Sequence, residues 1–265
     1  MTFLSDILSL LSGLSIGFVL SLIGGGGSVL ATPLLVYVVG VKSPHVAIGT
    51  GAIAVAVNAF ANLIGHARAG HVKWNCALIF AASGFIGAGI GSTLGKHFDG
   101  QKLLLLFGIV MIVVAAQMFV NRSAEGNANL RLTAETARQL VPPLIGYGFA
   151  VGVLSGFFGI GGGFLVVPGL VAATRMSLIM AVGSSLVSVT VFGATTAANY
   201  AISGLVDWRL VALFLAGGIV GGLVGGVLAT KLSKEHRALS LIFAVVVAVV
   251  GLYVVYRGVR NLLGT

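Results

Sequence analysis

Charged residues are scarce in this chain of 265 residues, and their scarcity decides its class. Asp, Glu, Lys and Arg together make up 8% of the sequence, whereas soluble globular domains use about 25%. Hydrophobic residues make up 58%. A chain with so few charges lies far outside the composition of soluble domains, and nothing in it alternates as a lipid-facing strand would. The sequence therefore predicts an all-α polytopic membrane protein.

Acidic residues are missing from the interior of the apolar stretches. All six lie at or beyond the ends of these stretches: Asp6, Asp99, Glu125, Glu135, Asp207 and Glu235. A sodium site or a proton relay needs a carboxylate within the membrane, so cation transport is disfavoured. The net charge of +9 comes from Lys and Arg in loops and at stretch ends. Anionic headgroups favour these places, so the basic residues indicate contact with membrane lipids and not with nucleic acid.

Motifs for metals, cofactors and catalysis are also missing. The single cysteine, Cys76, excludes a disulfide or a thiolate cluster within one chain. His66 and His71 stand five residues apart without further ligands, which is weak evidence for a metal. The GGGGS segment lacks the GK[ST] ending of a phosphate-binding loop, and no HExxH occurs. The sequence predicts no cofactor, no metal and no catalytic residue, and a membrane-embedded enzyme or assembly factor is the least supported alternative.

Apolar stretches are what the chain has in abundance. They run over 7–40, 46–64, 74–95, 102–120, 141–173, 178–202, 208–230 and 238–256. Most are close to the ~20 residues of a spanning helix. The first and fifth are too long for one span, and each breaks at a glycine cluster. Each is expected to form a helix pair, either as two short spans or as a re-entrant hairpin, followed by three transmembrane helices.

The second half of the chain repeats the first. The matching positions include Gly17 with Gly152, Gly24 with Gly159, Pro33 with Pro168, Thr50 with Ser184, Trp74 with Trp208, and Gly84 with Gly218. The two tryptophans are the only ones in the chain. We expect a first repeat over 1–120, a polar linker over 121–140 and a second repeat over 141–265, within one integrated transmembrane domain. A helix pair opening each repeat makes the repeats inverted, and the distribution of Lys and Arg also favours inversion.

The two glycine clusters are the first candidates for a binding site. They comprise Gly24, Gly25, Gly26, Gly27 and Ser28 in the first repeat, and Gly159, Gly161, Gly162 and Gly163 in the second. A break followed by a helix leaves unpaired N–H groups and the positive end of a helix dipole within the membrane, and such a terminus binds anions. The alternative is that the glycines only permit close helix packing. Packing requires spacing and not consecutive glycines, so binding is favoured.

Polar residues on the helix after each cluster are the second set of candidates. Thr50, Asn58 and Asn62 fall at steps of four or eight, which places them on one helical face. The second repeat offers Ser184, Ser188 and Thr196. Neutral donors of this kind hydrogen-bond an anion without holding it irreversibly. Hydrogen bonding between helices is the alternative for each of them.

The paired motifs resemble one family. GGGG-S-x-L-x-x-P and FFGIGGGF-x-x-x-P, each followed by AxG[TS] and by G-x-V-x-W, are similar to the sulfite exporter TauE/SafE family over essentially the whole chain. The resemblance implies a secondary carrier, often an exporter, for anions such as sulfite, thiosulfate or organosulfonates. It rests on Gly24–Ser28 with Pro33 and on Gly159–Gly163 with Pro168. Ile160 replaces one glycine of the second cluster, which predicts that the two half-sites are not equivalent.

The sequence therefore predicts a multi-pass carrier of the bacterial inner membrane, with alternating access around a site between the repeats. Its partners are expected to be a small-molecule anion and membrane lipids, and a homo-oligomer is left open. An anion channel built from the same halves is the main alternative. The identity of the anion, the direction of transport and the coupling ion do not follow from the sequence, because selectivity among oxyanions depends on cavity size and hydrogen-bond geometry.

Overall fold

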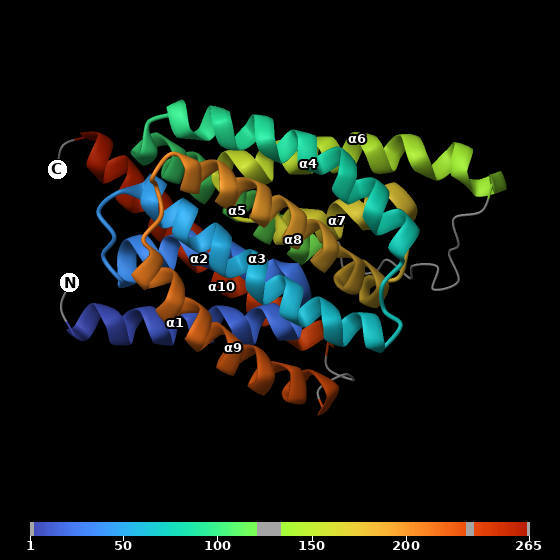
Figure 1. The fold of residues 1–265 in the computed structure, drawn as a ribbon, viewed down its shortest axis with the longest axis horizontal. Coiled ribbons are helices and arrows are strands. Elements are labelled where there is room, and N and C mark those ends of the chain that lie inside the picture. The colour runs from blue at the N-terminus through green and yellow to red at the C-terminus, as the bar shows by residue number, and fades with distance from the viewer. Residues whose placement is uncertain (1–2, 121–133, 232–235, 264–265) are drawn as a thin grey trace.

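The computed structural model describes residues 3–120, 134–231 and 236–263, and every element in this part of the chain is a helix (Figure 1). The α-helices are α1 (Phe3–Ile23), α2 (Ala31–Pro33), α3 (Pro44–Arg68), α4 (Trp74–His97), α5 (Gly100–Val120), α6 (Ala134–Phe158), α7 (Gly163–Thr174), α8 (Leu178–Ile202), α9 (Trp208–Lys231) and α10 (His236–Leu263). A 3-10 helix (Gly24–Leu30) precedes α2, and a π-helix (Leu34–Val38) follows it.

Eight of these helices are long and apolar enough to cross a membrane: α1, α3, α4, α5, α6, α8, α9 and α10. Two shorter apolar segments, Gly27–Val38 and α7, follow α1 and α6. The twelve residues of α7 rise about 18 Å, less than the ~30 Å of a hydrocarbon core. The prediction of an all-α polytopic membrane protein is confirmed, with one long and one short apolar helix where each repeat begins.

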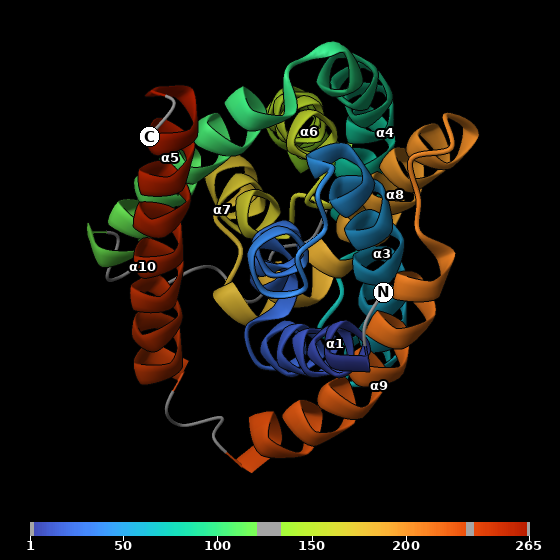
Figure 2. The ribbon, with the colours of Figure 1, turned by 90° about the vertical axis from the view of Figure 1, so that its left-hand side faces the viewer.

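The long helices surround the two short segments. Viewed along the helices, α7 and the segment after α1 lie in the middle of a ring (Figure 2). The closest pairings around this ring are α1 with α9, α4 with α6, α3 with α8, and α5 with α10. Each of these pairs joins a helix of the first half to a helix of the second half.

Glycines let the backbones of the two helices come into direct contact in two of these pairs. Gly17 of α1 lies directly against the backbone of Gly218 in α9, and Gly152 of α6 lies directly against that of Gly84 in α4. A Cβ at either position would overlap the facing backbone. The two contacts are equivalent under the sequence repeat, because Gly17 matches Gly152 and Gly84 matches Gly218.

Two equivalent hydrogen bonds fix how α3 and α8 cross. The Thr50 hydroxyl near the start of α3 accepts from the backbone N–H of Asp207, just beyond α8, at 3.0 Å. The Ser184 hydroxyl near the start of α8 accepts from the N–H of Lys73, just beyond α3, at 2.9 Å. The start of each helix thus lies beside the end of the other, so α3 and α8 run in opposite directions.

Helix α6 begins earlier than the expected linker boundary. It starts at Ala134, so part of the 121–140 stretch is helical and Pro142 and Pro143 lie inside the helix. The residues that precede the prolines, AETARQL, are mostly good helix formers, which explains why the helix starts before the apolar run. Residues 121–133 of the linker lie outside the described residues.

Candidate functional site

The second glycine cluster forms a turn that only glycine adopts readily. Gly159, Gly161 and Gly162 have φ angles of 68°, 64° and 69°, in the left-handed region. The turn ends α6 at Phe158 and starts α7 at Gly163. Gly162 is the N-cap of α7 and supplies no side chain to its first turn. The first amides of α7 therefore carry the positive end of the helix dipole without a capping side chain.

A buried hydroxyl faces this turn. Ser155, one turn before the end of α6, is fully buried, and its Oγ has no hydrogen-bond partner in the part of the chain that the structure describes. A Cβ built on Gly162 would lie 2.7 Å from this Oγ, so the hydroxyl sits directly beside the glycine backbone. A buried donor without a partner costs free energy, which makes this hydroxyl a candidate ligand group.

The other neighbours of the turn are apolar. Ile48 of α3 packs against Gly159, and Val55 of α3 and Val189 of α8 lie beside Gly161. The turn therefore lies where α3 and α8 cross. Apolar walls lower the local dielectric constant and strengthen any hydrogen bond between the turn and a ligand.

The first glycine cluster has a different conformation. Gly24, Gly25, Gly26 and Gly27 lie in a 3-10 helix that continues through Ser28 to Leu30, so the helical hydrogen bonding changes type without stopping. Ser28 is fully buried. Thr32, one turn later, is also buried, and its Oγ1 has no partner among the described residues.

The polar residues of α3 and α8 differ in whether their side chains are hydrogen-bonded. The Thr50 and Ser184 hydroxyls accept from the loop N–H groups already described, so both already have partners in this conformation. Ser188 and Thr196 of α8 are fully buried, and neither hydroxyl has a partner in the described ranges. The residues of α3 that line the glycine turn are Ile48 and Val55, so its polar stripe does not face that turn.

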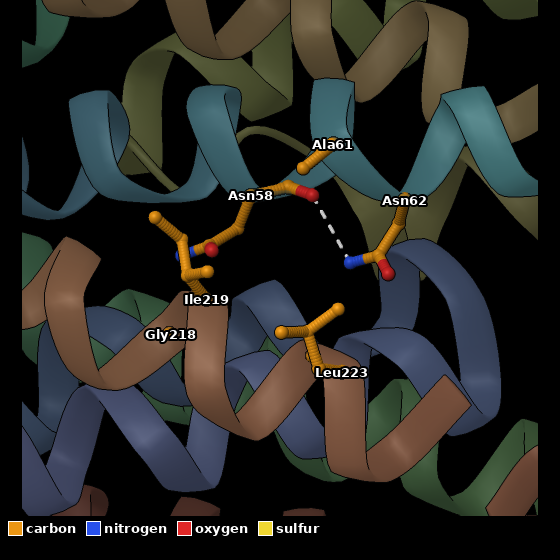
Figure 3. A pocket seen from close by; sticks show the side chains of 7 residues that line it. Asn58, Ala61, Asn62, Gly218, Ile219 and Leu223 are labelled. Atoms are coloured by element: carbon orange, nitrogen blue, oxygen red, sulfur yellow. Dashed lines mark hydrogen bonds between the residues drawn. The ribbon is translucent and has the colours of Figure 1, made fainter. Parts of the chain in front are cut away.

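Asn58 and Asn62 instead face α9, across a pocket of about 100 Å³ (Figure 3). Its lining is Asn58, Ala61, Asn62, Gly218, Ile219, Gly222 and Leu223. Asn58 is 2% exposed, and its Nδ2 has no partner among the described residues. The Asn62 Nδ2 donates to the Asn58 carbonyl oxygen at 3.0 Å. The structure thus brings the two amides together at one pocket.

The pattern reasoning missed a polar cluster between α4 and α8. The Lys96 ammonium donates to the Asn199 Oδ1 at 2.6 Å and to the Ser203 Oγ at 2.8 Å. The Asn199 Nδ2 donates to the Ser92 Oγ at 2.6 Å and to the Thr93 Oγ1 at 3.0 Å. The signal was present, because Ser92 and Lys96, like Asn199 and Ser203, stand four residues apart near helix ends.

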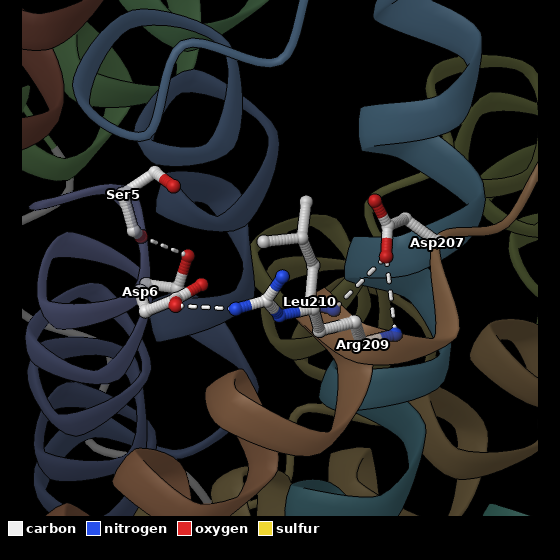
Figure 4. A network of polar contacts seen from close by, with 6 residues as sticks. Ser5, Asp6, Asp207, Arg209 and Leu210 are labelled. Atoms are coloured by element: carbon white, nitrogen blue, oxygen red, sulfur yellow. Dashed lines mark hydrogen bonds and ion pairs between the residues drawn. The ribbon is translucent and has the colours of Figure 1, made fainter. Parts of the chain in front are cut away.

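The acids are used at helix ends, as Figure 4 shows for two of them. Asp207 caps α9, its Oδ1 accepting from the N–H groups of Arg209 and Leu210 at 3.0 and 3.1 Å. The Arg209 guanidinium pairs with Asp6 of α1 at 2.6 Å. Asp99 caps α5 through the N–H groups of residues 101 and 102. Each of these three acids thus has a role at the edge of the helical bundle.

The two neighbouring histidines do not form a metal centre with other described residues. The rings of His66 and His71 lie 5.7 Å apart, centroid to centroid. No group of three His, Cys, Asp or Glu side chains comes together in the ranges that the structure describes.

Comparison with known proteins gives one family and several relatives. The family model described as "Sulfite exporter TauE/SafE" matches residues 9–254. A "Probable membrane transporter protein" of Xylella fastidiosa (strain 9a5c) is 48% identical over 262 residues, covering 99% of both chains. The "Probable membrane transporter protein YunE" of Bacillus subtilis is 27% identical over 277 residues, covering 97% of this chain and 99% of that protein. No solved structure matches the chain.

Proposed function

This chain belongs to the sulfite exporter TauE/SafE family, and from that premise we propose that it exports small sulfur-containing anions across the bacterial inner membrane. Sulfite, thiosulfate and organosulfonates are the candidate substrates. The coarser conclusion, a multi-pass membrane transporter, follows from the family, from the relatives and from the eight membrane-length helices.

One observation carries the choice of an anion: the uncapped start of α7 beside the buried Ser155 hydroxyl. A helix N-terminus offers backbone N–H groups and a positive dipole end, which suit sulfur–oxygen groups. The hydroxyl adds a donor without adding a fixed charge. A site made only of neutral donors binds an anion and also releases it.

The proposed binding path lies between the halves and includes both glycine clusters and the polar residues of α3 and α8, of which Asn58 and Asn62 face α9 and not the glycine turn. Its members are Gly24, Gly25, Gly26, Gly27, Ser28, Thr50, Asn58, Asn62, Gly159, Gly161, Gly162, Gly163, Ser184, Ser188 and Thr196. In this conformation Thr50 and Ser184 are bonded to loops. Their release is therefore part of the conformational change that the proposal requires.

Alternating access is proposed to arise from rocking of inverted repeats. Two observations support it: the Gly17 and Gly152 contacts are equivalent across the halves, and so are the hydrogen bonds of Thr50 and Ser184. Helices α3 and α8 run in opposite directions at the centre of this arrangement. Equivalent contacts of this kind let one half take the conformation of the other with little change in energy.

Ligand-induced stabilisation of the purified protein tests the substrate class. The melting temperature is measured with sulfite, sulfate, thiosulfate, sulfoacetate, taurine, phosphate and small carboxylates, because a ligand that binds only the folded state stabilises it by RT ln(1 + [L]/Kd). A shift confined to sulfur oxyanions or sulfonates is expected. No shift with any anion, in a sample shown to be folded, would overturn the proposal.

Flux into liposomes then tests the mechanism with the anion that gave the largest shift. A carrier saturates with substrate and turns over slowly, since each cycle needs a conformational change on the microsecond-to-second scale. Conductance far above such rates would replace the carrier with an anion channel built from the same halves.

A further inference from the structure

Two lines of contact between neighbouring helices, which we call seams, are equivalent under the sequence repeat but differ in the structure. The first is the α3–α9 seam, and the second is the α4–α8 seam. Asn58 of α3 matches Phe192 of α8, Gly218 of α9 matches Gly84 of α4, and Gly65 matches Asn199. The two seams can therefore be compared turn by turn.

The α4–α8 seam is closed from Gly84 to Lys96. The Phe192 ring packs directly against Gly84 and stacks with Phe80, with centroids 6.3 Å apart. Further along, the Asn199 amide holds Ser92 and Thr93, and Lys96 holds Asn199. Aromatic packing followed by hydrogen bonds leaves this seam shut up to the ends of both helices.

The α3–α9 seam is closed at one level and widens beyond it. Asn58 packs closely against Gly218. One turn later, a Cβ built on Gly222 would have the Asn62 amide as its nearest side-chain neighbour, at 3.9 Å. At Gly65, which matches the bonded Asn199, an added Cβ would meet nothing within 4 Å. Asn58 therefore takes the place of Phe192 in this seam, whereas Gly65 offers no side chain where Asn199 makes its hydrogen bonds.

We propose that the pocket of the α3–α9 seam is the subsite that recognises the oxygens of the substrate and limits its size. The inference rests on the proposed function and deepens it. Asn58 and Asn62 line the pocket. The Asn58 Nδ2 lies buried against Gly218 without a partner among the described residues, so a turn of this side chain brings an unused donor to an oxyanion in the pocket. The pocket of about 100 Å³ has room for about three water molecules at the density of the liquid. This volume suits an ion as small as sulfite, and a longer sulfonate extends beyond it.

Gly222 and Ile219 of α9, together with Leu223, form the wall opposite the amides. Among these three residues, only Gly222 has no side chain beside Asn62. The size of the residue at position 222 therefore decides how large an anion fits. A methyl group there makes ordinary van der Waals contact at 3.9 Å and is tolerated sterically. Gly222 is therefore a specificity-determining residue.

Filling the pocket from α9 tests the inference. The variants are Gly222→Ala, which the geometry accommodates, and Gly222→Leu, which fills the pocket. Gly146→Leu is the matched control, because Gly146 of α6 is exposed and has open space around it. Dissociation constants for sulfite, thiosulfate and sulfoacetate are measured from melting shifts and compared with flux in liposomes.

We expect Gly222→Ala to weaken binding of sulfoacetate on the order of tenfold, the effect of about one methyl group in a fitted pocket, and to weaken sulfite less. Gly222→Leu should abolish binding of both, and Gly146→Leu should change neither. Unchanged affinities in both Gly222 variants would overturn the subsite while leaving the transporter proposal intact. If the unaltered protein binds none of these anions, the proposed function itself fails.

Discussion

The two glycine clusters match each other in the sequence repeat but differ in backbone conformation. The first, Gly24–Gly27, continues as a 3-10 helix, whereas Gly159, Gly161 and Gly162 form a left-handed turn that breaks the chain between α6 and α7. The adjoining seams also differ, because Phe192 packs against Gly84 in the α4–α8 seam, whereas the α3–α9 seam has Asn58 against Gly218 and a pocket beside Asn62. In the proposed mechanism the two copies therefore contribute differently: the second offers amides at a helix start, and the first offers a side-chain pocket.

The largest expected effect comes from placing a side chain in the glycine turn. Gly161→Val forces a β-branched residue to φ near 64°, which costs about 1–2 kcal/mol, and its Cβ would lie 2.9 Å from Val55. We expect liposome flux to be lost, with expression and monodispersity retained. The matched change Gly26→Val meets no left-handed backbone, because 3-10 geometry is open to all residues.

Both variants are expected to lose transport if both clusters bind the anion. Retained flux in Gly26→Val alone would restrict the site to the glycine cluster of the second half. Full activity in both variants would remove the glycine clusters from the mechanism.

The next effect is on stability and separates the two seams. Phe192→Ala removes a fully buried ring that packs against Gly84 and Phe80, and such changes cost about 3–5 kcal/mol. The equivalent change Asn58→Ala removes an amide whose nitrogen has no partner among the described residues, so its cost should be well below that of Phe192→Ala. Thermal unfolding in one detergent compares the two directly, and equal losses would mean that the seams are packed alike.

A smaller effect is expected from the Lys96 cluster. Lys96→Met leaves Asn199 and Ser203 without the ammonium that now bonds to them. Hydrogen bonds to charged groups contribute about 1.5–3 kcal/mol, and partial exposure reduces this to about 1 kcal/mol. Lys96→Arg keeps the charge and should recover part of the loss in melting temperature. No difference between Met and Arg would show that the charge does not hold the α4–α8 seam.

The smallest effect is expected at Gly65, the open counterpart of Asn199. An added Cβ meets nothing within 4 Å, and replacing glycine by alanine inside a helix gains roughly 0.5–1 kcal/mol. Gly65→Ala should therefore raise the melting temperature slightly. A decrease would mean that another part of the chain covers this position, so that the α3–α9 seam is not open there.

The sequence carried the fold further than the site. Low charge, apolar stretches and two interrupted segments predicted the helical membrane fold, because the bilayer leaves few alternatives. The step of four between Asn58 and Asn62 predicted their common face, but not that this face meets α9. That depends on how α9 packs against α3, where Gly218 leaves room for the Asn58 side chain.

Lys96 shows why the other polar contacts could not be predicted from the sequence. A lysine near the end of an apolar stretch is expected to extend to the membrane surface, and only tertiary packing places Asn199 and Ser203 around it. In the sequence, Phe192 likewise cannot be told apart from any other apolar residue of the core. Its role as the closure of one seam follows from its match to Asn58, which has meaning only once both seams are seen together.

The pairing of helices across the halves has a consequence for biosynthesis. Helices α1, α3, α4 and α5 each take their main neighbour from a helix that the ribosome makes later: α9, α8, α6 and α10. When only the first 120 residues have been made, none of these four helices has its main neighbour. Assembly across the halves can therefore begin only with the insertion of α6, and it cannot be complete before α10 is inserted.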